Sequence, residues 1–212
     1  MLNFANILTM SRIAAIPAIV GLLLVQGLVW HWIALALFIL ACVTDWFDGY
    51  VARRLDQVSP LGRFLDPIAD KLVVAAVLLI LVSIGHIDGW SILAALVILC
   101  REILVSGLRE FLAELRVGVP VSMLAKWKTA VQMIALGFLI VAKPESEVPI
   151  NAMLIGEILL WIAAAMTVIT GYDYMTIGLK HMAASQPPKS QPPKSQPPKS
   201  EPRSTPDARQ TR

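Results

Sequence analysis

Residues that hold soft metals or form disulfides are scarce in this sequence. It has two cysteines and three histidines in 212 residues. Cys42 and Cys100 lie inside apolar runs, where a buried, inert thiol is expected and a disulfide framework is not. His31, His86 and His181 fall in expected loops or a tail, without the spacing of metal ligands. The sequence therefore excludes a disulfide-rich domain and assigns no role to its histidines.

Charge is scarce as well, since Asp, Glu, Lys and Arg make 16% of the chain and hydrophobic residues make 57%. Several apolar runs reach the roughly 20 residues that a helix needs to cross the hydrocarbon core of a bilayer. The runs are continuous and do not alternate with a period of two, which favours helices over barrel strands. No removable signal peptide is expected at the start. The sequence predicts an all-α integral membrane protein.

Six transmembrane helices are expected, separated by turn signals. Their expected ranges are 11–29, 30–52, 62–84, 90–112, 128–141 with its flanks, and 150–172. A short interfacial helix is expected over residues 3–12, where the composition is mixed. Every second loop is rich in Lys and Arg, so the positive-inside rule predicts that both termini face the cytoplasm.

The composition changes after about residue 183, which divides the chain into a membrane domain (1–183) and a tail (184–212). The pentapeptide SQPPK occurs three times, beginning at Ser185, Ser190 and Ser195. Such a sequence cannot bury a core, so a disordered, partly polyproline-like tail is expected. Its lysines offer weak contacts with anionic membrane lipids.

A third of the scarce acidic residues gather in one stretch, DWFDGYVARRLDQVSPLGRFLDPIAD. Residues three or four apart share a face of a helix. Asp45 and Asp48 therefore share a stripe near the end of the second span, and Asp66 and Asp70 share one at the start of the third. The loop between these spans is short, which predicts antiparallel neighbours with facing acidic stripes. Asp56 lies in the loop, off both stripes, and is interpreted as solvated charge.

Four carboxylates in a partly dehydrated place repel one another, and each costs about 2.5–3.5 kcal/mol at a helix centre. Carboxylate oxygens without His or Cys are the ligands of hard ions such as Mg2+ or Mn2+. Two such ions would cancel the four charges, and a two-metal site suits phosphoryl transfer. Gly49, Ala52 and Gly62 leave room for a phosphate-bearing group near the backbone. The alternative is a solvated helix end at the membrane surface.

The acidic stretch resembles the signature of the CDP-alcohol phosphotransferase family at every position. The matching residues are Asp45, Asp48, Gly49, Ala52, Arg53, Gly62, Asp66 and Asp70. The resemblance implies a six-helix enzyme of the bacterial inner membrane, often homodimeric, with a cytoplasmic site and no nucleic-acid partner. The four aspartates would bind the metal pair, and Asp70 would also act as general base on the acceptor hydroxyl. The glycines, Ala52 and Arg53 would border the cytidine diphosphate.

Further segments resemble bacterial members of the family that use glycerol 3-phosphate as acceptor, notably NILTMSRI, REILVSGLREFLAEL and VSMLAKWKTAVQM. The implied reaction transfers the phosphatidyl group of CDP-diacylglycerol to sn-glycerol 3-phosphate, which gives phosphatidylglycerophosphate and CMP. The side chains suited to the acceptor phosphate are Ser106, Arg109, Lys126 and Lys128. Positive-inside topology alone is an alternative reason for the three basic residues.

Polar residues inside the fourth and fifth spans also need partners. Arg101 and Glu102 lie deep in the fourth span, where a polar cavity or an ion pair is expected. Adjacent helical residues point in different directions, which argues against a direct pair between these two. Arg101 is interpreted as structural, and the role of Glu102 stays open. Gln132 is expected to bond a neighbouring helix.

Three polar residues near the start have two interpretations. Asn6, Thr9 and Arg12 either cap the first helix or touch the nucleotide lipid.

The sequence also leaves rival functions open. The same chemistry could use phosphatidylglycerol or inositol phosphate as acceptor, and a cation or proton transporter would also need intramembrane aspartates. Against a transporter, the acids crowd at one membrane face. An inactive scaffold is disfavoured by the intact acidic set.

Overall fold

A computed structural model describes residues 4–25, 27–55, 60–114, 123–142 and 152–184. Within these ranges the chain forms six helices and no strand, which confirms the all-α prediction. The helices are α1 (Phe4–Leu24), α2 (Leu28–Leu55), α3 (Pro60–Ser83), α4 (Ser91–Glu114), α5 (Met123–Val141) and α6 (Ala152–Ala184).

Three of the described helices are long and apolar enough to cross a membrane. The candidate spans are Ser91–Ala113, Met123–Val141 and Ala152–Lys180. Shorter apolar stretches occur over Leu8–Leu24 and Leu28–Thr44. Large apolar side chains face outward on several helices, as expected where lipid replaces water. These observations support a membrane protein, and the count of six spans stays a prediction.

Several helix boundaries differ from the expected ones. The described part of α1 is continuous from Phe4 to Leu24, so the expected interfacial helix over residues 3–12 is not a separate element there. α5 begins at Met123, before the expected start at residue 128. α6 continues to Ala184, beyond residue 172, because no proline interrupts the sequence before the SQPPK repeats. Beyond Ala184, the predicted tail lies outside the described residues.

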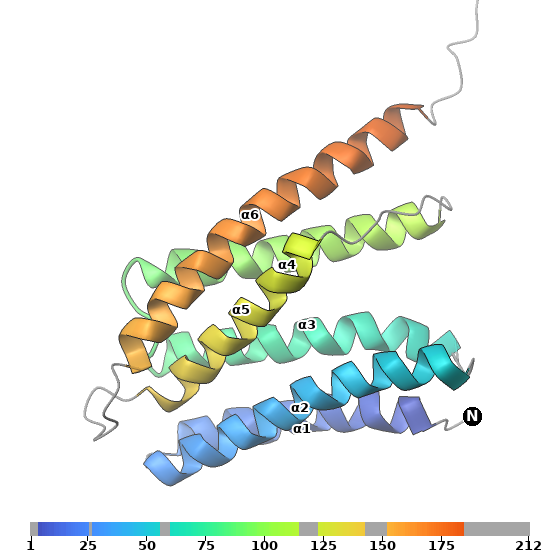
Figure 1. The fold of residues 1–212 in the computed structure, drawn as a ribbon. Coiled ribbons are helices and arrows are strands. Elements are labelled where there is room, and N and C mark those ends of the chain that lie inside the picture. Colours follow the sequence, from blue (N-terminus) through green and yellow to red (C-terminus); the bar gives the residue numbers. More distant parts are fainter. Residues whose placement is uncertain (1–3, 26, 56–59, 115–122, 143–151, 185–212) are drawn as a thin grey trace, which may run out of the picture.

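The helices form two groups, which are joined by α5 and by packing of α3 against α4. In the N-terminal group, α1 packs against both α2 and α3, and in the C-terminal group, α6 packs against both α4 and α5. α5 also contacts α2 and α3. Figure 1 shows the start of α1, the end of α2, the start of α3 and the end of α6 at the same end of the bundle. This arrangement agrees with the expected antiparallel order of the second and third spans.

Each described helix buries apolar side chains in the core. The best buried are Ile19, Phe38, Leu81, Ile98, Leu136 and Leu160, one from each helix and none more than 2% exposed. Glycines let α6 approach its neighbours closely, because a Cβ atom at Gly156 would lie 2.7 Å from Leu139 Cγ. Small residues at helix crossings are how membrane helices gain packing contacts without a hydrophobic driving force between them.

Two histidines meet inside the fold, at the end opposite to the acidic stretch. His31 is 4% exposed and His86 is 5% exposed, and their ring centroids are 5.3 Å apart. His86 Nδ1 lies 2.7 Å from the carbonyl oxygen of Leu139 in α5. The expectation that His31 lies in a loop is wrong, since this residue belongs to α2. The pair links α2 and the α3–α4 connection to α5.

Candidate functional site

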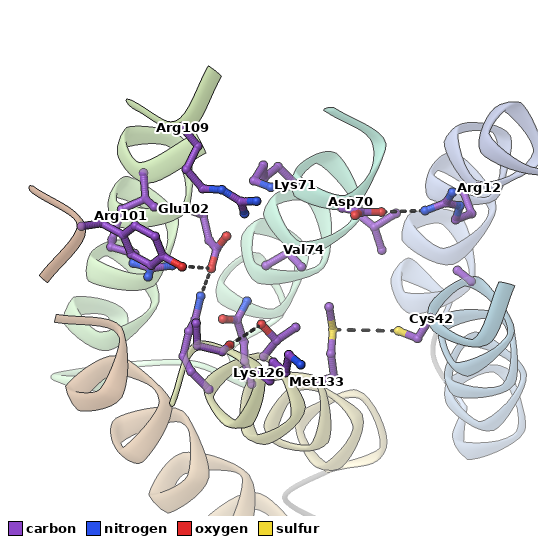
Figure 2. A pocket seen from close by; sticks show the side chains of 18 residues that line it. Arg12, Cys42, Asp70, Lys71, Val74, Arg101, Glu102, Arg109, Lys126 and Met133 are labelled. Atoms are coloured by element: carbon purple, nitrogen blue, oxygen red, sulfur yellow. Dashed lines mark hydrogen bonds and ion pairs between the residues drawn. The ribbon is translucent and has the colours of Figure 1, made fainter. Parts of the chain in front are cut away.

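A cavity of about 480 Å³ opens between the two helix groups, and all six described helices contribute lining residues. Figure 2 shows how its charged side chains face one another across the space. The charged lining residues are Arg12, Asp70, Lys71, Arg101, Glu102, Arg109, Lys126 and Lys128. Among them, six cations outnumber two carboxylates. A concave site with this excess of positive charge favours an anionic ligand.

A second recess of about 280 Å³ adjoins the first, because the two share lining residues on α3 and α4. Ser106 lines this recess, and Lys71, Arg101, Glu102 and Arg109 line both. The expected acceptor-phosphate residues therefore lie around one continuous space. Ser106 and Arg109 come from α4, and Lys126 and Lys128 come from the start of α5.

The aspartate expected to act as base forms an ion pair at one side of the cavity. Arg12 Nη1 of α1 lies 2.6 Å from Asp70 Oδ1 of α3. The Arg12 side chain is 2% exposed and that of Asp70 is 39% exposed. Figure 2 shows the Asp70 carboxylate directed toward Arg12, so the buried arginine orients a carboxylate that lines the cavity and is still partly exposed.

On the other side of the cavity, one carboxylate contacts two cations. Lys128 Nζ of α5 donates a hydrogen bond to Glu102 Oε1, and Arg101 Nη1 lies 3.5 Å from the same oxygen. The three side chains are 3%, 18% and 13% exposed, respectively. The expectation that Arg101 and Glu102 do not pair is therefore wrong. Adjacent Cβ atoms do diverge, but the long, flexible arginine side chain curves back to its neighbour.

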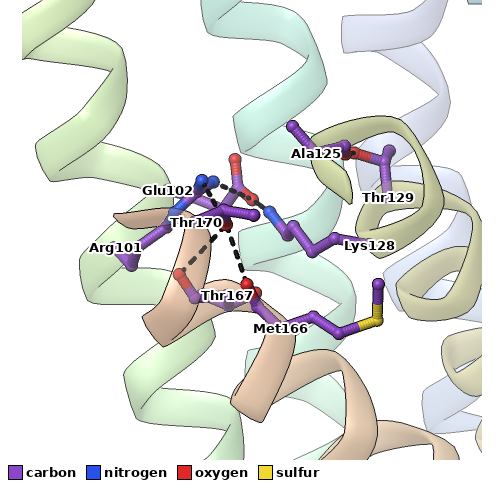
Figure 3. Close-up of polar contacts among 8 residues, drawn as sticks. All are labelled: Arg101, Glu102, Ala125, Lys128, Thr129, Met166, Thr167 and Thr170. Atoms are coloured by element: carbon purple, nitrogen blue, oxygen red, sulfur yellow. Dashed lines mark hydrogen bonds and ion pairs between the residues drawn. The ribbon is translucent and has the colours of Figure 1, made fainter. Parts of the chain in front are cut away.

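Arg101 is also held by α6, as Figure 3 shows. Its Nη2 donates a hydrogen bond of 2.8 Å to Thr170 Oγ1. The Thr170 hydroxyl in turn donates to the carbonyl oxygen of Met166, also at 2.8 Å. The guanidinium carbon lies 5.9 Å from the centroid of the Tyr174 ring, within the range of a cation–π contact.

Gln132 of α5 lines the cavity and is 2% exposed. Its Oε1 atom is buried without a hydrogen-bond partner in the described part of the chain. The expected bond from this oxygen to a neighbouring helix is therefore not found there. A buried polar atom of this kind is an available partner for a ligand in the cavity.

Most residues of the acidic signature are described only as helical backbone. Asp45, Asp48, Gly49, Ala52 and Arg53 belong to the last turns of α2, and Gly62 and Asp66 belong to the first turns of α3. Their side chains lie outside the described part of the structure, as does that of Asn6. The backbone brings the end of α2 and the start of α3 to one end of the bundle (Figure 1). The facing acidic stripes stay a prediction.

Thr9 and Arg12, near the start of the chain, do not cap the first helix. Asn6, Thr9 and Arg12 all lie inside α1, which has already begun at Phe4. Thr9 is fully buried and does not line the cavity described above, whereas Arg12 does. The capping interpretation is therefore wrong for Thr9 and Arg12, and for Asn6 it falls on a side chain outside the described part of the structure.

The donor chemistry of this region fits a hard divalent cation. Asp70 presents a half-exposed carboxylate that already attracts one cation, the guanidinium of Arg12. Among the side chains that the structure describes, no group of three His, Cys, Asp or Glu residues is close enough to hold a metal. The other three signature aspartates lie outside that set, so an oxygen-only site formed with Asp70 remains a prediction.

Comparisons with known proteins place the chain in a family. The family model described as CDP-alcohol phosphatidyltransferase matches residues 2–169. A relative from Rickettsia bellii named CDP-diacylglycerol–glycerol-3-phosphate 3-phosphatidyltransferase is 49% identical, and the match covers 81% of this chain and 93% of the relative. Relatives of the same name are 40% identical in Cereibacter sphaeroides (85% of this chain, 97% of the relative) and 37% identical in Bacillus subtilis (83% and 95%). The chain belongs to the CDP-alcohol phosphatidyltransferase family.

Proposed function

We propose that this chain transfers the phosphatidyl group of CDP-diacylglycerol to sn-glycerol 3-phosphate, which yields phosphatidylglycerophosphate and CMP. The observation that carries the proposal is one cavity with a half-exposed carboxylate, Asp70, on one side and a group of cations on the other. Its volume of about 480 Å³ suits a small phosphorylated alcohol. The names of the relatives support the same reaction.

The acceptor phosphate lies, in this proposal, among Ser106, Arg109, Lys126 and Lys128. Guanidinium and ammonium groups form strong, charge-assisted hydrogen bonds with phosphate oxygens. The dianionic phosphate would then offset part of the surplus of positive charge among the described lining residues. Binding there directs the hydroxyl end of glycerol 3-phosphate toward the Asp70 side of the cavity.

Asp70 acts as the general base in this proposal. A base must come within about 2.6–3.2 Å of the hydroxyl oxygen that it deprotonates, or act through one water. The ion pair with Arg12 fixes the orientation of the Asp70 carboxylate at the edge of the cavity. We retain Asn6 and Arg12 as candidate contacts to the nucleotide lipid, whereas Thr9 is fully buried and does not line this cavity.

Asp45, Asp48, Asp66 and Asp70 would hold two Mg2+ or Mn2+ ions. The chemistry that such ions would supply is stabilisation of the negative charge that develops on the phosphate oxygens during transfer. Gly49, Ala52, Arg53 and Gly62 would border the cytidine diphosphate, because the small residues admit a phosphate close to the helix backbone and Arg53 supplies positive charge. The spacing of these residues on two helices that meet at one end of the bundle supports this arrangement.

We further propose that all six helices span the bacterial inner membrane, with the site and both termini on the cytoplasmic side. The pattern of basic loops and the common end shared by the start of α1 and the end of α6 support this topology. Association into a homodimer is part of the same proposal and follows from the family resemblance.

Purified protein supplied with CDP-diacylglycerol, Mg2+ and a panel of acceptors tests the reaction. The panel contains glycerol 3-phosphate, phosphatidylglycerol, inositol phosphate and water alone, and the lipid product is identified by mass. We expect phosphatidylglycerophosphate and CMP in equal amounts with glycerol 3-phosphate only. A product formed chiefly from another acceptor would replace the proposed substrate, and no CMP with any acceptor would refute transferase activity.

A further inference from the structure

Arg101 is a second cation beside a carboxylate that already has one. Lys128 Nζ donates to Glu102 Oε1, and Arg101 Nη1 lies 3.5 Å from that oxygen. The three groups together carry a net positive charge in a largely buried position. An uncompensated buried charge is costly, so this cluster is incomplete as a purely structural ion pair. An anion in the cavity would complete it.

The guanidinium of Arg101 has donors to spare. An arginine side chain carries five N–H groups in a planar fork. Nη2 donates to Thr170, and Nη1 is at 3.5 Å from Glu102, which is long for a hydrogen bond. Nε is buried without a hydrogen-bond partner in the described part of the chain. Nε lies against α6, where a Cβ atom at Gly171 would be 3.4 Å away, so the donors left for a ligand are the remaining N–H groups of Nη1 and Nη2. Arg101 lines both recesses, where an anionic ligand would lie.

Helix α6 sets the direction of this side chain at two neighbouring positions. The Thr170 hydroxyl donates to the carbonyl oxygen of Met166, which leaves its lone pairs oriented to accept from Arg101 (Figure 3). A Cβ atom at Gly171 would lie 3.1 Å from Arg101 Cγ and 3.4 Å from its Nε. Because Gly171 has no side chain, the aliphatic part of Arg101 can pack directly against α6.

We propose that Arg101 binds the phosphate of the acceptor, and that Thr170 and Gly171 are positioning residues that aim its guanidinium into the cavity. The inference rests on the proposed function, since it assumes a phosphorylated acceptor. The planar fork matches two oxygens of one phosphate, a geometry that Lys128 alone cannot supply. The family match ends at residue 169, so both positioning residues lie just beyond the part of the chain that the family model covers.

Four variants at three positions test this proposal in the purified full-length protein. Thr170→Val removes the hydroxyl with little change of shape, and Thr170→Ser restores it. Gly171→Ala adds a methyl group that would crowd the side chain of Arg101. Gly178→Ala is the matched control, because its Cβ would lie 2.9 Å from Leu108 Cδ1 in the same interface between α4 and α6, and not near Arg101. The measurements are the melting temperature, kcat, and the KM values for glycerol 3-phosphate and for CDP-diacylglycerol.

We expect Thr170→Val and Gly171→Ala to raise the KM for glycerol 3-phosphate about tenfold, the order of effect of one hydrogen bond to a charged group. The KM for CDP-diacylglycerol should change less than about twofold, and Thr170→Ser should behave as the wild type. Gly178→Ala should lower the melting temperature and leave both KM values unchanged.

An equal rise of both KM values, or a rise in Gly178→Ala that matches that in Gly171→Ala, would overturn the positioning role. If Gly171→Ala does not fold, the test rests on Thr170→Val. An unchanged KM for glycerol 3-phosphate in Thr170→Val also overturns the proposal. A wild-type protein that forms no lipid product from glycerol 3-phosphate refutes the proposed function instead, so the two failures are distinguishable.

Discussion

Replacing Lys128 with methionine separates the structural and substrate-binding roles of the buried cation. Methionine has a similar length and no charge, so the change removes the hydrogen bond to Glu102 without opening a large cavity. Glu102 would keep only Arg101, whose Nη1 lies 3.5 Å from Oε1. The carboxylate is 18% exposed and can gain little compensation from water.

The expected loss of stability follows from this geometry. Removing one partner of a buried ion pair costs about 3–5 kcal/mol. Because Arg101 stays beside Glu102, we expect Lys128→Met to cost somewhat less, about 2–3 kcal/mol. For a chain of this size, that loss corresponds to a fall in melting temperature of about 4–12 °C. The lost contact to the acceptor phosphate should raise the KM for glycerol 3-phosphate roughly 10–100-fold.

The double variant Lys128→Met with Glu102→Gln is the informative comparison. Glutamine removes the unpaired charge, so the double variant should regain at least half of the lost melting temperature. It should not regain the KM for glycerol 3-phosphate, because the cation is still missing. Recovery of that KM in the double variant, or a single variant as stable as the wild type, would contradict the assignment of two roles to Lys128.

Four other perturbations address the base, the acceptor site, the helix packing and the tail. Asp70→Asn should abolish CMP release and leave the fold intact, since its amide oxygen can still accept from the buried arginine of α1. Arg109→Ala should raise the KM for glycerol 3-phosphate more than that for CDP-diacylglycerol. Gly156→Ala should destabilise the protein by about 1–3 kcal/mol, because the new methyl group would overlap Leu139. Truncation after Ala184 should spare activity, given the composition of the tail.

Each of these outcomes has a direct check. Normal CMP release by folded Asp70→Asn would show that another group is the base. Equal KM changes in Arg109→Ala would indicate a role in topology alone. For the packing variant, Gly21→Ala is the control, because nothing lies within 4 Å of a Cβ atom there, and equal melting temperatures would contradict the packing argument. A large loss of activity on truncation would assign a function to the tail.

The sequence predicted the helices well because long apolar runs leave the backbone no other way to satisfy its hydrogen bonds in lipid. It predicted helix ends less well. The mixed composition of residues 3–12 suggested a separate element, yet the described residues continue as one helix into the apolar stretch that follows. α5 begins at Met123 and includes Lys126 and Lys128, because long basic side chains near the end of a membrane helix can extend their charged groups to water.

Contacts within the site were harder to anticipate. The ion pair between Arg12 and Asp70 joins residues 58 positions apart, and no local spacing rule predicts it. The ion pair between Arg101 and Glu102 was not predicted, because the Cβ atoms of adjacent helical residues point in different directions. The long side chain of Arg101 nevertheless reaches Glu102. Lys71 lines the cavity and was missed, although its place next to Asp70 was a usable signal. By contrast, the three basic residues expected at the acceptor site do line the cavity.

The cavity takes lining residues from every described helix, and this construction has a consequence for how the protein loses activity. No helix is a mere spacer, since sliding any one of them by a single turn, about 5.4 Å, withdraws at least one lining side chain. Helices held in lipid can drift in this way without unwinding. We therefore expect turnover to be lost before helicity, so a harsh detergent should abolish activity at concentrations that leave the circular dichroism of the helices unchanged.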